Sequence, residues 1–124
     1  DMRLPIQYAL LYPERVDTGL PRLDIAAQGT LTFAKPDPQR YPALSLAYKV
    51  MEAGGTMPAV MNAANETAVA SFLDGRIGFL GIYEIVRRVT ELHVPVPEPD
   101  LSQILEADAW ARGTAMAVME ETVV

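Results

Sequence analysis

Apolar side chains recur at helical spacing in the middle of the chain, and this pattern predicts helices in three successive segments. The first segment begins near Tyr41 and is closed by a pair of glycines, which commonly end helices. The second starts at Thr56, a candidate N-cap, and runs to Asp74, with Gly75 as C-cap. The predicted apolar faces are Leu44, Ala47, Tyr48 and Met51 in the first helix, Val60, Met61, Ala64, Ala68 and Phe72 in the second, and Ile82, Ile85, Val86, Val89 and Leu92 in the third.

The third helix is followed by a segment that cannot be helical. Proline alternates with other residues over 94–99, so we expect an extended, polyproline-like spacer. Beyond it, Asp100 is predicted to cap a short helix that ends near Leu105. Asp108 is predicted to cap a separate final helix, and the inward residues of that helix are expected to be Ala111, Ala115, Val118 and Met119.

Proline also shapes the beginning of the chain, where six of the ten prolines precede residue 43. These prolines exclude a long regular element from this region. A short helix is predicted from Leu4 to about Tyr12, because Asp1 can cap it, Pro5 suits a first helical turn and Pro13 stops it.

Residues 30–33 alternate polar and apolar side chains of strand-favouring types, which predicts a short strand at an edge or added to another sheet. The expected fold class is therefore mainly α, with a small C-terminal bundle of about four helices. A proline-rich arm with one short helix and one short strand precedes the bundle. We place the boundary between arm and bundle at residues 1–40 and 41–124.

Composition is that of a single globular domain, with 50% hydrophobic and 21% charged residues. The net charge of -6 arises entirely after residue 90, where seven acids accompany Arg112 alone. This charge argues against nucleic acid or an anionic membrane as a partner of that end. The chain has no cysteine, which excludes disulfides, zinc-thiolate sites and thiol nucleophiles. No apolar run approaches the roughly 20 residues that span a bilayer, so we expect a soluble protein.

Motifs of catalysis or cofactor binding are missing from the sequence. No glycine-rich dinucleotide or phosphate-binding turn is present, and the three serines in helical patterns would share one histidine, His93. We expect His93 to have a surface role or to interact with the C-terminal dipole of its helix. Glu120 and Glu121 diverge on a helix and are expected to be solvated. No catalytic residue and no metal ligand is predicted within this chain.

One helical segment is unusual because it holds the only two asparagines of the chain, and asparagine forms helices poorly. Asn62 and Glu66 share a face at i, i+4, and Asn65 lies one step round the helix. We expect these side chains to bond to the arm or to a neighbouring domain where the helix docks. Contact with a ligand is the alternative.

Several ordered segments closely resemble one enzyme family, the 1-deoxy-D-xylulose 5-phosphate reductoisomerases. The resemblance covers roughly residues 1–93, and the stretch from Asp108 to Arg112 resembles the family's last helix more loosely. The matching segments are Asp1-Met2-Arg3-Leu4-Pro5-Ile6, Tyr12-Pro13-Glu14-Arg15, Pro21-Arg22-Leu23-Asp24, Leu31-Thr32-Phe33 with Pro36-Asp37, Arg40-Tyr41-Pro42, and Asn62-Ala63-Ala64-Asn65-Glu66.

The resemblance implies the C-terminal portion of an enzyme that uses NADPH and a divalent cation (Mg, Mn or Co). Such enzymes rearrange and reduce 1-deoxy-D-xylulose 5-phosphate to 2-C-methyl-D-erythritol 4-phosphate, on the methylerythritol phosphate route to isoprenoids. Met2 matches the family's methionine beside the nicotinamide and substrate. The family's catalytic acids, lysine and lid residues have no counterpart here.

The resemblance further implies that the partners are upstream NADPH-binding and catalytic domains of the same chain. A homodimer is expected for the full-length enzyme, in the bacterial cytoplasm or in a plastid. The sequence begins at Asp1 rather than at a methionine, so we expect further residues to precede it in the full-length protein. We expect no cofactor to bind this fragment and no activity from it alone. The alternative is a free-standing helical protein-interaction module without catalysis.

Overall fold

A computed structural model of the protein describes residues 2–122, and every regular element in that range is a helix. The chain divides into two compact units, the first ending at Lys35 and the second beginning at Pro36. Within the described residues, no helix combines the length and hydropathy needed to cross a membrane.

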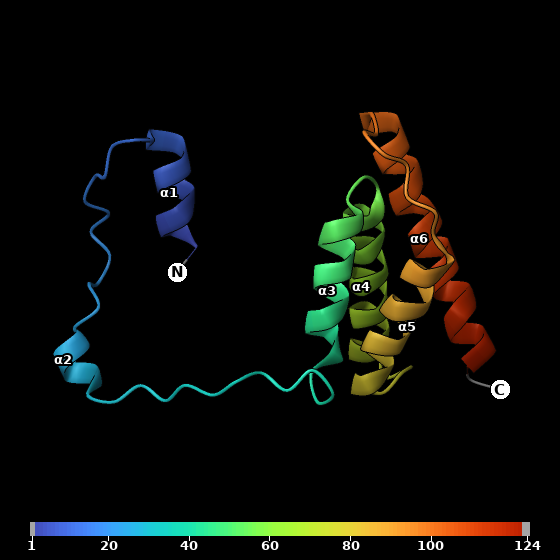
Figure 1. Cartoon of the computed structure of the whole chain (residues 1–124), viewed down its shortest axis with the longest axis horizontal. Coiled ribbons are helices and arrows are strands. Elements are labelled where there is room, and N and C mark those ends of the chain that lie inside the picture. The colour runs from blue at the N-terminus through green and yellow to red at the C-terminus, as the bar shows by residue number, and fades with distance from the viewer. Residues whose placement is uncertain (1, 123–124) are drawn as a thin grey trace. The chain divides into compact units, whose positions relative to one another are not determined.

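The first unit contains two helices, α1 (Arg3–Leu11) and α2 (Ile25–Gln28), coloured blue in Figure 1. Helix α1 confirms the predicted short helix, with Pro5 in its first turn. Asp1, its predicted N-cap, lies outside the described residues. Helix α2 was not predicted, and it is capped by Asp24, whose Oδ1 accepts a hydrogen bond from the backbone N–H of Ala27 at 3.1 Å.

The strand predicted over residues 30–33 was wrong. These residues have no regular secondary structure, and Phe33 at the end of the segment is 86% exposed. A strand needs a neighbouring strand to satisfy its backbone groups, and the described residues offer none. Alternation of side chains was therefore not sufficient to form the element.

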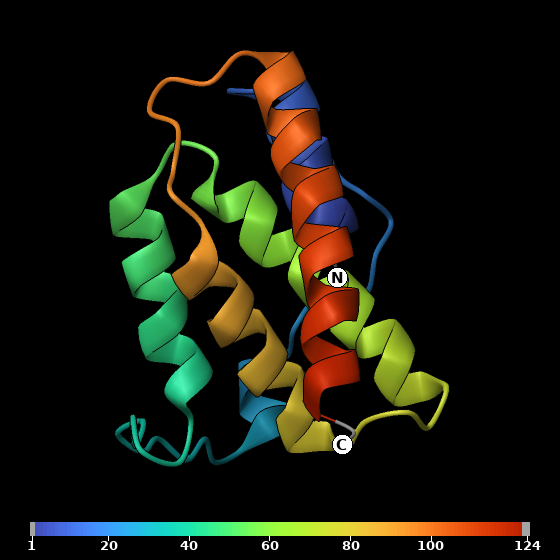
Figure 2. The same cartoon turned by 90° about the vertical axis from the view of Figure 1, so that its right-hand side faces the viewer.

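The second unit is a bundle of four helices, as predicted: α3 (Pro42–Ala53), α4 (Met57–Leu73), α5 (Phe79–Leu92) and α6 (Leu101–Thr122). Figure 1 shows α4 between α3 and α5, and Figure 2 shows α4 in yellow-green, crossing behind α5 and α6. Helix α4 packs most extensively against α5 and α6, whereas α3 makes a smaller contact. The bundle core therefore centres on α4.

Small and branched apolar residues fill this core. Alanines of α4 and α6 face one another, and their small side chains let the two helices approach closely. Larger apolar side chains of α5 complete the same core. The core residues are Val60, Ala63, Ala64 and Ala68 from α4, Ile85, Val86 and Val89 from α5, and Ala107, Ala111, Ala115, Val118 and Met119 from α6.

The predicted apolar face of α3 was largely wrong. Tyr48 and Met51 are 61% and 68% exposed, whereas Val50 is buried and Leu46 packs against the core. Helix α3 carries apolar residues on two sides, so periodicity alone could not decide which side faces inward. Leu92 of α5, also predicted inward, is exposed in the last turn of its helix.

The predicted break before Asp108 is absent, because residues 101–122 form one continuous helix. Asp108 is not a cap; its carboxylate accepts hydrogen bonds from Arg112 one turn later. No glycine or proline stands between Leu101 and Asp108 to end the first half. Asp100 does cap the helix, since its Oδ1 accepts from Gln103 N at 2.9 Å and Gln103 Oε1 accepts from Asp100 N at 3.0 Å.

Candidate functional site

Met2, the predicted cofactor contact, immediately precedes α1 and is 71% exposed. No residue of α1 is buried, and Leu4, Ile6 and Leu10 are also exposed. Helix α1 therefore presents apolar side chains that the first unit itself does not cover.

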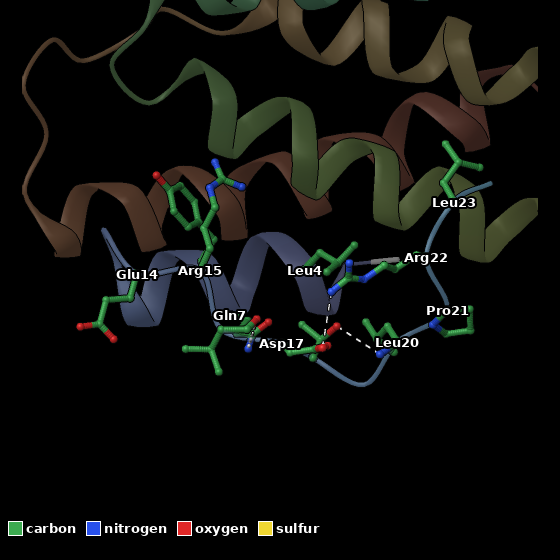
Figure 3. A pocket seen from close by; sticks show the side chains of 12 residues that line it. Leu4, Gln7, Glu14, Arg15, Asp17, Leu20, Pro21, Arg22 and Leu23 are labelled. Carbon is green, nitrogen blue, oxygen red and sulfur yellow. Dashed lines mark hydrogen bonds and ion pairs between the residues drawn. The ribbon is translucent and has the colours of Figure 1, made fainter. Parts of the chain in front are cut away.

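An open pocket of about 540 Å³ lies between α1 and the segment that follows it (Figure 3). The guanidinium of Arg15 stacks over the ring of Tyr8, with its central carbon 4.4 Å from the ring centre. Arg22 forms an ion pair with Asp17 at 3.5 Å, and both side chains are largely exposed. The charged groups of Arg15, Asp17 and Arg22 therefore already have partners within the first unit.

The asparagine motif lies on the exposed side of α4, and its three polar residues do not act alike. Asn62 Nδ2 donates a hydrogen bond to Glu66 Oε1 at 3.3 Å. Asn65 is exposed, and no hydrogen bond joins its side chain to another described residue. The predicted docking role is therefore still open for Asn65, whereas Asn62 and Glu66 already pair with each other.

Glu66 also connects α4 to α6. Its Oε2 accepts a hydrogen bond from Arg112 Nη2 at 2.7 Å, and Arg112 Nε donates to Asp108 Oδ2, also at 2.7 Å. The hydrogen bond from Arg112 is the main reason that the pKa of Glu66 lies below its ordinary value. Asp108 first and Glu66 second raise the pKa of Arg112. The three charged groups form a partly exposed brace between the helices.

Thr56 and His93 form a second, more buried contact. The Oγ1 atom of Thr56 lies 2.7 Å from Nε2 of His93 and accepts a hydrogen bond from Val96 N at 3.0 Å. Val96 O in turn accepts from Thr56 N at 3.2 Å. Thr56 occupies the predicted N-cap position of α4, but its side chain makes no capping hydrogen bond, because the hydroxyl bonds to His93 and Val96 instead.

His93 also packs beside Trp110 of α6, with ring centres 5.1 Å apart. Burial lowers the pKa of His93, so the neutral imidazole is favoured in the folded protein. We expected a surface or helix-dipole role for His93, and that expectation did not include its contacts with Thr56 and Trp110. We name Thr56, His93 and Val96 the spacer latch, because they attach the 94–99 spacer to the start of α4.

Sequence reasoning missed the latch because its residues are separated by 37 and 40 positions. The polyproline spacer was the only available signal, since a non-helical segment needs partners for its backbone groups. Among residues 2–122, no group of three or more His, Cys, Asp or Glu side chains could hold a metal ion. Both polar clusters, the brace and the latch, thus join elements of the bundle to one another.

A family model described as the DXP reductoisomerase C-terminal domain matches residues 1–114. The chain is 61% identical over 112 residues to 1-deoxy-D-xylulose 5-phosphate reductoisomerase from Heliobacterium modesticaldum, covering 90% of this chain and 29% of that protein. It is 54% identical over 121 residues to the protein of that name from Pelotomaculum thermopropionicum, covering 98% and 31%. The chain thus spans about a third of the length of these relatives.

Solved structures show the same similarity. The enzyme from Zymomonas mobilis in complex with NADPH is 44% identical, with a TM-score of 0.84 over 97% of this chain and 32% of that one. A DOX-P reductoisomerase in complex with NADPH, fosmidomycin and magnesium is 33% identical, with a TM-score of 0.82 over 97% and 32%.

Proposed function

Because this chain belongs to the family of DXP reductoisomerase C-terminal domains, we propose that it completes an NADPH- and divalent-metal-dependent reductoisomerase. In this proposal the full-length enzyme converts 1-deoxy-D-xylulose 5-phosphate to 2-C-methyl-D-erythritol 4-phosphate, for isoprenoid synthesis. Residues 1–40 form the end of the central catalytic domain and the linker arm, and residues 41–124 form the C-terminal helical domain. The names of the relatives, and the NADPH and magnesium in solved relatives, support this assignment.

The observation that carries the proposal is the contrast between the two units. The bundle has a closed apolar core, whereas no residue between 2 and 35 is buried. Leu10, Leu23 and Phe33 are among the exposed apolar residues of the first unit. An apolar segment without a core is expected where a chain packs against a larger body. The first unit therefore suits the edge of a catalytic domain that lies upstream.

In this proposal the upstream part of the enzyme holds the metal. Among residues 2–122, no group of three or more His, Cys, Asp or Glu side chains could hold one. The cofactor supplies a hydride to the carbonyl that is reduced. Met2 provides an apolar, polarizable side chain beside the nicotinamide and substrate, and its contribution is to exclude water. No residue of this chain transfers a proton in the proposed reaction.

The asparagine motif has a supporting role in the proposal. Asn62 and Glu66 hold α4 against α6 through Arg112, as their hydrogen bonds indicate. Asn65, whose amide has no partner among the described residues, faces the upstream domains. We extend the proposal to a homodimer located in the bacterial cytoplasm, or in a plastid for a photosynthetic eukaryote.

A chimera tests the proposed function. The matching 112 residues of the Heliobacterium modesticaldum enzyme are replaced by this chain, and oxidation of NADPH is followed with the sugar phosphate and magnesium. We expect turnover by the chimera and none by the 124-residue chain alone. A folded chimera without turnover would exclude the proposed function, and turnover by the isolated chain would exclude a purely supporting role.

A further inference from the structure

A groove of about 680 Å³ opens on the second unit, between the beginning of α3, the middle of α4 and the beginning of α5. Its walls are mostly apolar, and the side chains that matter here are Tyr41, Leu46, Met61, Leu80, Ile82 and Val86. Leu46, Met61 and Ile82 rest on the bundle core, so the floor of the groove is fixed by the fold.

The rim of the groove exposes large apolar side chains at the start of α5. Leu80 is 82% exposed, and Phe79 beside it is also exposed, although its ring contacts Phe72 edge to face at 5.9 Å. Neighbouring apolar side chains exposed beside a concave apolar surface mark an interaction site more often than an ordinary surface. The groove therefore has the character of an uncovered interface.

Asn65 is the one amide side chain on these walls. It is exposed and makes no hydrogen bond within the described residues. An amide carries both donors and an acceptor, which suits pairing with a free backbone group of an occupant. The groove thus fits an apolar segment that presents an unpaired backbone N–H or C=O opposite Asn65.

The path of the chain indicates where such an occupant comes from. The polypeptide enters the bundle through residues 36–41, and Arg40 and Tyr41 at the end of this passage line the groove. The chain covers only 29% and 31% of its relatives, and the family match is to a C-terminal domain, so most of such an enzyme precedes it. Residues that precede the bundle belong to the same polypeptide as the groove, which raises their effective concentration near it.

We propose that this groove docks an apolar segment of the catalytic body that precedes residue 1 in the same polypeptide, with Asn65 bonding to the backbone of that segment. The inference rests on the proposed function and adds the surface through which the helical domain is fixed to the enzyme. A second copy of the chain is a poorer occupant, because a two-fold interface brings the same concave surface together with itself.

Thiol labelling tests the docking, since the chain contains no cysteine of its own. Leu80→Cys is placed in the chimera and in the isolated 124-residue chain, and the rate of maleimide modification is read by peptide mass spectrometry. The control is Leu105→Cys on α6, an exposed leucine outside the groove. We expect Leu80→Cys to react at least about tenfold more slowly in the chimera, and the control to react equally in both.

The outcomes separate the two proposals. Equal labelling of Leu80→Cys in an active chimera would overturn the docking and leave the proposed function standing. Slower labelling of the isolated chain at higher protein concentration would identify a second copy as the occupant and would also overturn the docking. Loss of turnover in the chimera before any cysteine is introduced would count against the proposed function instead.

Discussion

The hydroxyl of Thr56 and the imidazole of His93 meet at 2.7 Å, although 37 residues separate them along the chain. The contact joins the start of α4 to the residue that follows α5. Since Thr56 is fully buried and also bonds to Val96 in both directions, the latch holds the spacer against the turn between α3 and α4.

We expect Thr56→Val to destabilise the bundle by about 1 to 3 kcal/mol, because it leaves the backbone N–H of Val96 and the ring of His93 without a partner. Urea unfolding of the 124-residue chain, followed by circular dichroism, measures this loss. Thr67→Val is the matched control, since Thr67 only donates to the carbonyl of Ala63 in its own helix. If both variants lowered the free energy of unfolding equally, the spacer latch would not stabilise the bundle more than an ordinary hydrogen bond within a helix.

His93 should make stability depend on pH. Burial lowers its pKa in the folded state, so at pH values below about 6.5 the unfolded chain binds more protons than the folded chain. The free energy of unfolding should therefore fall as pH falls from 7 to 5. Urea titrations across this range measure the slope, and His93→Gln, which cannot titrate, should flatten it. An unchanged slope in that variant would assign the dependence to other groups.

Gly55→Ala should displace the spacer. A Cβ at this position would collide with the carbonyl oxygen of Val96, and φ is +55°. Gly54 separates the two effects, because its φ is +62° but nothing lies within 4 Å of its added Cβ. We expect Gly55→Ala to lower the unfolding free energy by at least about 1 kcal/mol more than Gly54→Ala. The chemical shift of the His93 ring should move only in Gly55→Ala.

The hydrogen bond from Arg112 in the brace should affect the pKa of Glu66. Arg112→Met removes the main cause of its lowered pKa, so that pKa should rise toward its ordinary value, as measured by NMR. Any stability that Glu66 contributes is present above about pH 4.5 and is lost as pH falls through its lowered pKa. Arg88→Met removes a different link, between α5 and Glu121 of α6, and should leave the Glu66 titration unchanged.

Asn65→Ala should act differently in the isolated chain and in the complete enzyme. Asn65 has no hydrogen bond within the described residues, so alanine should stabilise the 124-residue chain by up to about 0.5 kcal/mol through helix propensity. In the chimera the same change should lower the melting temperature, because it removes the proposed partner of the upstream backbone. Asn62→Ala, which breaks a bond to Glu66 instead, should have effects of similar size in both. A chimera unaffected by Asn65→Ala would leave this amide without a docking role.

Sequence patterns predicted where the helices lie better than they predicted which residues those helices pack and bond with. Helix α5 could be predicted because apolar and charged residues alternate along it at a clear helical period. The inward face of α3 could not be predicted, since apolar residues on two of its sides leave burial to be decided by tertiary packing. Asp108 has the chemistry of a cap, yet it bonds to Arg112 inside a helix that nothing interrupts.

The candidate site follows the same rule. Asn62, Asn65 and Glu66 stand out because asparagine is unusual inside a helix, and the structure confirms that Asn62 and Glu66 share one face. Arg112 and the spacer latch could not be found in advance, since both depend on contacts between residues far apart in the sequence. Local patterns carry no information about such long-range pairs.

The alanines packed between α4 and α6 limit which amino-acid substitutions this domain can accept. Ala64, Ala68, Ala111 and Ala115 have no exposed surface, and every amino acid except glycine is larger than alanine. Nearly every substitution there adds volume where no space exists, and such overpacking costs typically about 1 to 3 kcal/mol. Variation in the bundle should therefore accumulate away from this contact, on the outer sides of the helices.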